Sequence, residues 1–211
     1  MTLRRAVLWQ LGAFGASVAA SAVYGAFLPD RVPTHWGLSG QPDAWGSKWI
    51  NLLMMPGMLL AFIVLTLVLP AISPKGYRIE SFSGTYGYVM ALVSGLFLTL
   101  HVIILQASLA PSLDMGRFII AAIFGFFALI GNVLGRVKRN FWVGIRTPWT
   151  LASEQVWKET HRSAARLWLI GGIVGVLASL VGVNPPLLFA YLMVLAFVPV
   201  FQSFLISRRL G

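Results

Sequence analysis

The sequence predicts an all-α, polytopic membrane protein with six transmembrane helices, and three observations lead to that prediction. Of the 211 residues, 58% are hydrophobic and only 10% are charged, whereas soluble domains carry about a quarter charged residues. The hydrophobic residues gather in six runs, each close to the roughly 20 residues that cross a bilayer. The basic residues fall mostly on one side of these runs. A soluble core could not bury so much apolar surface, so the bilayer must be the solvent.

The six hydrophobic runs give the order of the elements. They cover Ala6–Leu28, Leu52–Ile72, Thr85–Leu109, Arg117–Gly135, Leu167–Val183 and Leu187–Ile206. Only "NPP" separates the last two runs, so we expect a tight helical hairpin with Pro185 and Pro186 at its turn. Ala91/Gly95 and Gly131/Gly135 have the spacing that close helix packing in lipid uses. We therefore interpret residues 1–211 as a single integral membrane domain.

The distribution of Lys and Arg predicts the orientation of the helices. If the N-terminus is inside, the inner segments hold 13 of the 16 basic residues, and the outer segments hold the other 3, Arg31, Lys48 and Arg117. Cytoplasmic loops are enriched in Lys and Arg, so we expect both termini in the cytoplasm. The outer loop is then 29–51 and the inner loop 136–166.

The net charge of +10 points to lipid and away from nucleic acid. The basic residues flank apolar runs, so we expect anionic headgroups as a partner and no direct nucleic-acid contact. The chain has no cysteine, which excludes disulfides and Cys-ligated metals. The sequence lacks the hydrolase and metalloprotease motifs, and His161 with Glu154 or Glu159 lacks a nucleophile. We predict no enzymatic activity and no cofactor.

The outer loop is rich in Pro, Gly and Trp, which oppose a long helix. Its tryptophans suit the membrane interface, where the indole N–H stays hydrated. One interpretation is a structured loop lying on the headgroups. The other is a recognition surface built from Thr34, His35, Trp36 and Asp43, because aromatics on a Pro-fixed loop are low-entropy anchors. No third ligand accompanies His35 and Asp43 at a suitable spacing, so we predict no metal site.

The inner loop carries a helix-start signal after its basic residues. Thr147 can act as an N-cap with Pro148 at the first helical position. We expect a helix from Trp149 to about Arg166 that lies along the inner interface and leads into the fifth span.

Three features of this loop lead to more specific expectations. Glu154 and Lys158 have the i,i+4 spacing of a helical ion pair, and Trp157 and His161 are i,i+4 neighbours. The loop carries a net charge of +5, from seven basic residues and two glutamates, which favours an anionic leaflet. Arg146 lies in a turn, where its guanidinium would serve either as a structural clamp or as a ligand contact.

The two loops together resemble a known bacterial family. The inner "NFWVGIRTPWTLASEQVWKETHR" is similar to the signature of SdpI-type immunity proteins. The outer "LPDRVPTHWGLSGQPDAWGSK" resembles a short module near the start of many bacterial membrane proteins. The inner positions that the resemblance implies are Asn140, Gly144, Arg146, Thr147, Pro148, Trp149, Thr150, Trp157, Thr160, His161 and Arg162. The outer positions are Pro33, His35, Gly40 and Asp43, beside Thr34 and Trp36.

The resemblance implies a protein of the bacterial inner membrane that gives resistance to a secreted peptide or protein toxin. It also implies signalling to a cytoplasmic transcriptional repressor through the inner loop. A small-solute or ion transporter or channel is the alternative, because His101, Gln106 and Asn132 place polar groups inside spans. Interhelical hydrogen bonds explain these residues as well.

Overall fold

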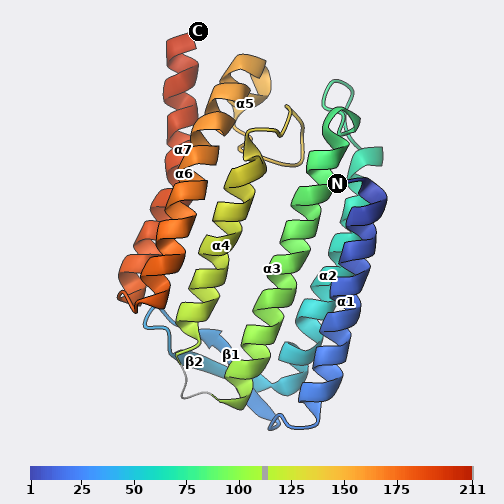
Figure 1. Cartoon of the computed structure of the whole chain (residues 1–211), viewed down its shortest axis with the longest axis vertical. Helices are drawn as coiled ribbons and strands as arrows, with labels where there is room; N and C mark the ends of the chain where they lie inside the picture. Colours follow the sequence, from blue (N-terminus) through green and yellow to red (C-terminus); the bar gives the residue numbers. More distant parts are fainter. Residues whose placement is uncertain (111–113, 211) are drawn as a thin grey trace.

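The computed structural model describes residues 1–110 and 114–210, and within these ranges six long helices form a bundle (Figure 1). They are α1 (Leu3–Gly25), α2 (Lys48–Ala71), α3 (Ser83–Leu109), α4 (Gly116–Leu134), α6 (Glu154–Leu180) and α7 (Pro185–Leu210). Each is long and apolar enough to cross a membrane, so the predicted all-α polytopic fold is confirmed. Both termini and the short helix α5 (Pro148–Ala152) lie at one end of the bundle (Figure 1).

The long helices pack in two groups of three. Helices α1, α2 and α3 contact one another, helices α4, α6 and α7 form the second group, and α3 contacts α4 (Figure 1). A Cβ atom on Gly131 of α4 would lie 2.4 Å from the Leu169 nitrogen, and one on Gly172 of α6 would lie 2.5 Å from the Ala128 nitrogen. Helices α4 and α6 therefore approach backbone to backbone, as small residues allow in lipid. Gly95 of α3 has no such neighbour within 4 Å, so its predicted role in packing was wrong.

The polar residues that favoured a transporter do not converge on one site. His101 Nε2 lies 3.0 Å from the Ser21 hydroxyl, and the Gln106 amide donates to the Tyr24 hydroxyl. Both pairs join α3 to α1, whereas Asn132 lies on the exposed surface of α4. Two of the three residues thus act in helix packing.

The outer loop folds into a β-hairpin, which the sequence analysis did not predict. Strand β1 (Arg31–Trp36) pairs antiparallel with β2 (Pro42–Ser47), and the register shifts between Pro33 and His35. Proline lacks an N–H and is tolerated at edges and bulges of a sheet. Gly40, in the connecting turn, has a φ of 79°, which glycine adopts without steric cost.

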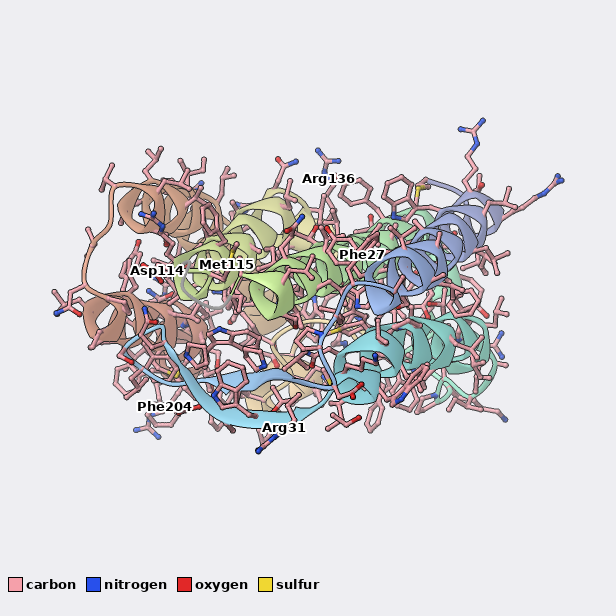
Figure 2. All side chains as sticks on the ribbon, turned by 90° about the horizontal axis from the view of Figure 1, so that it is seen from below. Phe27, Arg31, Asp114, Met115, Arg136 and Phe204 are labelled. Atoms are coloured by element: carbon pink, nitrogen blue, oxygen red, sulfur yellow. The ribbon has the colours of Figure 1, made fainter. Side chains whose placement is uncertain are left out.

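The hairpin contacts both groups of helices and lies across the end of the bundle opposite the two termini (Figures 1 and 2). The Asn51 amide of α2 donates to the Pro33 carbonyl at 2.8 Å and to the Ser108 hydroxyl of α3 at 2.9 Å. At the turn, a Cβ on Gly116 of α4 would lie 2.6 Å from the Gly40 Cα. The hairpin is therefore held at both ends.

The inner loop contains a helix break where we expected one interfacial helix. Thr147 caps α5 and Pro148 begins it, as predicted, but α5 ends at Ala152. Ser153 is extended and accepts a hydrogen bond from the Val156 N–H. Residues 154–166 are then the first turns of α6, which continues to Leu180. A separate helix lying along the interface is not confirmed.

Candidate functional site

The outer hairpin brings His35 and Asp43 together at its surface. Their Nδ1 and Oδ1 atoms lie 2.5 Å apart, and 68% and 51% of the two side chains are exposed. Gly37 makes room for this pair, because a Cβ there would lie 2.7 Å from the second Asp43 carboxylate oxygen. Across residues 1–110 and 114–210, no group of three His, Asp or Glu side chains forms. The arrangement offers a hydrogen-bonding pair to a partner outside the chain.

The other predicted outer residues divide into half-buried and buried ones. Thr34 and Trp36 are half-buried. Pro33 and Gly40 are buried because the first contacts α2 through Asn51 and the second packs on Gly116. Pro33 and Gly40 therefore hold the hairpin, and the side chains between them are presented.

In the inner loop, Asn140 closes a turn and is fully buried. Its amide donates to the carbonyls of Lys138 and Val143, at 2.9 and 2.8 Å. Its oxygen accepts from the N–H groups of Trp142 and Val143, both at 2.7 Å. All four hydrogen-bonding positions of this side chain are thus occupied by backbone groups. Asn140 acts as an internal brace.

His161 is held in one orientation by three contacts, which involve Trp157 and Ile145. Its ring stacks on Trp157 with centroids 4.0 Å apart, and its Nε2 accepts from the Ile145 N–H at 3.0 Å. The Nδ1 atom lies 2.8 Å from the Trp157 carbonyl, which can only accept. These contacts fix a neutral ring with its proton on Nδ1. Both nitrogens are engaged by backbone, which leaves neither for a substrate.

Gly144 is required at the point where the loop crosses these two rings. Its φ is 117°, outside the range that side-chain-bearing residues adopt readily. A Cβ there would lie 2.4 Å from His161 Nε2 and 3.2 Å from the Trp157 ring. The glycine therefore permits the Ile145 bond to His161.

The "TPWT" segment joins the loop to α7. Thr150 Oγ1 accepts from the Thr147 N–H at 2.9 Å and donates to the Ile145 carbonyl at 2.8 Å. The Trp149 indole donates to the Ser203 hydroxyl of α7 at 2.7 Å. Thr160 is buried, and Pro148 is exposed at the start of α5. Most of the predicted inner residues thus stabilise the loop itself.

Two arginines of the inner motif remain exposed. Arg146 donates from its Nη1 to the Phe141 carbonyl, so the clamp interpretation is realised, yet its side chain lies at the surface. Arg162 is exposed on α6, and no hydrogen bond or ion pair joins it to another described residue. The guanidinium groups of Arg146 and Arg162 are therefore the motif's accessible charges.

Some residues that organise this region were not predicted as site residues. Arg139 is one of the basic residues of the inner loop, and its Nη1 donates to the Leu151 carbonyl at 2.8 Å. The Tyr77 hydroxyl donates to the same carbonyl at 3.2 Å, and the guanidinium lies over the Tyr77 ring. Ser203 gave no sequence signal, since it lies in an apolar run far from the loop. Its contact with Trp149 depends on tertiary structure alone.

The glutamates near His161 are both paired with basic residues. Glu154 bonds to Lys158 at 2.8 Å, which confirms the predicted i,i+4 pair. Glu159 pairs with Arg209 of α7. Neither carboxylate is held against the imidazole, so the acid–base pair considered from the sequence is not assembled.

Six membrane-spanning helices and two motif-bearing loops define a multi-pass α-helical membrane protein. Residues 136–203 match the SdpI/YfhL protein family, and residues 12–60 match a domain of unknown function, DUF1648. The first of these matches includes the inner-loop motif, which confirms the resemblance seen there. The chain is 27% identical over 184 residues to the Immunity protein SdpI of Bacillus subtilis (strain 168), covering 86% of each chain. No solved structure matches the chain.

Proposed function

We propose that this protein is an immunity protein of the bacterial cell membrane that gives resistance to a secreted toxin. The observation that carries the proposal is the similarity to an immunity protein over 86% of both chains. The proposal includes one integral membrane domain with both termini in the cytoplasm, supported by the 13 to 3 division of basic residues. The hairpin then lies outside the cell, where a secreted toxin arrives.

The outer hairpin is the proposed toxin-contacting surface. His35 and Asp43 are exposed and hydrogen-bonded to each other, and Leu38 and Trp45 expose 61% and 47% of their surface beside them. A surface that joins polar groups to exposed apolar side chains suits an amphipathic, membrane-active peptide. Because both ends of the hairpin are anchored, little conformational entropy is lost on binding.

The inner loop is the proposed contact for a cytoplasmic transcriptional repressor, through Arg146 and Arg162. The hairpin touches α2 and α3 at its base and α4 at its turn, so a bound toxin can bias how the two helix groups pack. Helix α4 leads directly into the inner loop. Such coupling requires a toxin whose affinity differs between two arrangements of the bundle.

Survival of a sensitive bacterium tests the outer contact. Cells expressing the protein are exposed to a panel of secreted membrane-active toxins, and wild type is compared with His35→Ala and Asp43→Asn at equal membrane levels. We expect protection by wild type and about tenfold greater sensitivity in either variant, as for loss of an interface hot spot.

The matched control is Asp30→Asn, which removes a carboxylate at the base of the same loop. The Asp30 side chain is 95% exposed and pairs with Lys48, so this variant should protect like wild type. Protection by neither wild type nor variants, with normal insertion, would refute the immunity proposal. Solute-flux measurements would then test the transporter alternative.

Arg146→Ala tests the inner contact. We expect loss of signalling or protection with normal membrane insertion, because the exposed guanidinium is the group offered to a partner. Arg136→Ala, another exposed base of this loop, is the control and should behave like wild type. Unchanged function of Arg146→Ala at equal expression would remove Arg146 from the site.

A further inference from the structure

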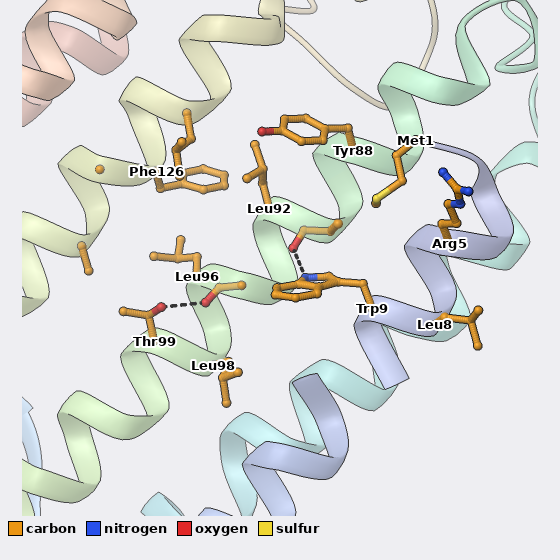
Figure 3. Close-up of a pocket in the computed structure, with 15 residues that line it drawn as sticks. Met1, Arg5, Leu8, Trp9, Tyr88, Leu92, Leu96, Leu98, Thr99 and Phe126 are labelled. Atoms are coloured by element: carbon orange, nitrogen blue, oxygen red, sulfur yellow. Dashed lines mark hydrogen bonds between the residues drawn. The ribbon is translucent and has the colours of Figure 1, made fainter. Parts of the chain in front are cut away.

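An apolar groove of about 900 Å³ opens on the side of the bundle, between α1 and α4 with α3 as its floor (Figure 3). Trp9 of α1 forms one wall and Phe126 of α4 forms the other. The volume is within the roughly 300–1,000 Å³ of small-molecule sites. The outer hairpin and the inner loop take no part in lining it.

Small residues at a four-residue spacing create the groove. Ala91, Gly95 and Thr99 of α3 all line it, and i,i+4 residues share one face of a helix. In the part of the chain that the structure describes, no neighbouring atom lies within 4 Å of a Cβ placed on Gly95. The Trp9 indole donates to the Ala91 carbonyl at 3.2 Å, which fixes the wall beside this floor (Figure 3). The space is therefore built into the backbone and is not filled by the chain's own side chains.

The length of the groove matches one leaflet of a bilayer. Along α3 it runs from Tyr88 to Thr99, which are 11 residues apart and so about 16 Å along a helix. Half of the hydrocarbon core is about 15 Å. A complete transmembrane helix of a second copy would extend over roughly twice this length.

Of the described side chains that line the groove, one is basic, and it lies at the end nearest the N-terminus. Arg5 is exposed, and no hydrogen bond or ion pair joins its guanidinium to another described residue. Arg4 is also exposed but does not line the groove. A guanidinium binds phosphate oxygens as a bidentate fork. The groove thus combines an apolar channel with a phosphate-binding group at its end.

We propose that this groove binds one acyl chain of an anionic phospholipid, with the phosphate held by Arg5. The lipid belongs to the leaflet on the N-terminal side, which is the cytoplasmic leaflet in the proposed orientation. Its tail passes between Trp9 and Phe126 and lies over Gly95. This site is separate from both motif-bearing loops and does not depend on toxin binding.

Native mass spectrometry of the detergent-purified protein tests the site, with phosphatidylglycerol or phosphatidylcholine added in equal amounts. We expect wild type to retain one phosphatidylglycerol with about a tenfold preference, because the choline ammonium of phosphatidylcholine compensates the charge of the phosphate that Arg5 binds. Arg5→Gln should lose that preference, and Gly95→Leu should lose retention of both lipids because leucine occupies the groove.

Two matched variants serve as controls. Arg4→Gln removes a neighbouring charge, and Gly57→Leu adds a side chain at another open helix position, on α2. Both should retain lipid like wild type. Equal retention in Gly95→Leu and Gly57→Leu, or an equal effect of Arg4→Gln and Arg5→Gln, would overturn the proposal. So would a wild-type dimer that Gly95→Leu converts to a monomer, because the occupant would then be a second copy of the chain.

Discussion

The outer hairpin and the inner loop each carry a histidine that the sequence marks out, and the two histidines lie in opposite surroundings. His35 has 68% of its side chain exposed, and its imidazole is bonded to the Asp43 carboxylate. His161 is buried, stacks on Trp157 and is bonded to backbone at both nitrogens. The first histidine is available to a partner, and the second is part of the loop's internal structure.

The same difference extends to the residues around each histidine. In the inner loop, Asn140, Thr147 and Thr150 are buried, and their polar atoms form hydrogen bonds with other groups of the same loop. In the outer hairpin, the buried positions include the anchoring Pro33 and Gly40, whereas His35 and Asp43 are exposed. The many motif residues of the inner loop therefore determine the structure of that loop. The fewer motif residues of the outer hairpin leave exposed side chains that a partner can contact.

The largest expected effect tests whether the inner motif is structural, through Gly144→Ala. The new Cβ would lie 2.4 Å from His161 Nε2, and the backbone conformation is unfavourable for alanine. We expect a loss of about 3 kcal/mol or more in the free energy of unfolding, from overpacking and strain together. Thermal unfolding in detergent and the amount of protein in the membrane both measure it.

Gly76→Ala separates the two contributions. Gly76 also has a positive φ, of 89°, but nothing lies within 4 Å of a Cβ there. Gly76→Ala should lower the free energy of unfolding by only about 1–2 kcal/mol, which is the contribution of the backbone conformation alone. Equal destabilisation by the two variants would show that the rings beneath Gly144 impose no steric requirement.

A smaller effect is expected from exchanging the two histidines for alanine. His161→Ala removes the acceptor of the Ile145 N–H and leaves a cavity on Trp157, so we expect a loss of about 2–4 kcal/mol. His35→Ala should change stability by no more than about 0.5 kcal/mol, as at most exposed sites, while reducing toxin protection. Thermal unfolding of the purified variants and toxin survival of cells that express them measure the two effects. A lower unfolding temperature for His35→Ala than for His161→Ala would contradict the comparison.

Features that depend on local chemistry could be predicted from the sequence. The six spans follow from the length of apolar chain that a bilayer requires, and each overlaps a helix in the structure. The cap at Thr147 and the Glu154–Lys158 pair depend on spacings of a few residues. Neighbouring residues fix these features, so no tertiary information was needed.

Features that depend on distant partners could not be predicted. Trp149 meets Ser203 and Trp142 meets Ser73 only after the helices have packed. The hairpin was not predicted because its two strands contain Pro33 and Pro42. The strand sequences also lack the regular alternation of apolar and polar residues that indicates a strand. The sequence feature that indicates this hairpin is the pair of short segments on either side of the glycine-containing "GLSGQ". The break at Ser153 was missed because the segment contains no Gly or Pro.

The smallest expected effect concerns the geometry of the outer pair, through Gly37→Ala. A Cβ at Gly37 would lie 2.7 Å from an Asp43 carboxylate oxygen, and the flexible Asp43 side chain would rotate away from His35. Stability should change by no more than about 0.5 kcal/mol. The toxin concentration that halves survival should fall by about threefold, less than in His35→Ala, because both side chains remain present. Gln41→Ala, on the same exposed turn, should have no effect. If Gly37→Ala protected as well as wild type while His35→Ala did not, His35 would act alone and its bond to Asp43 would not contribute to recognition.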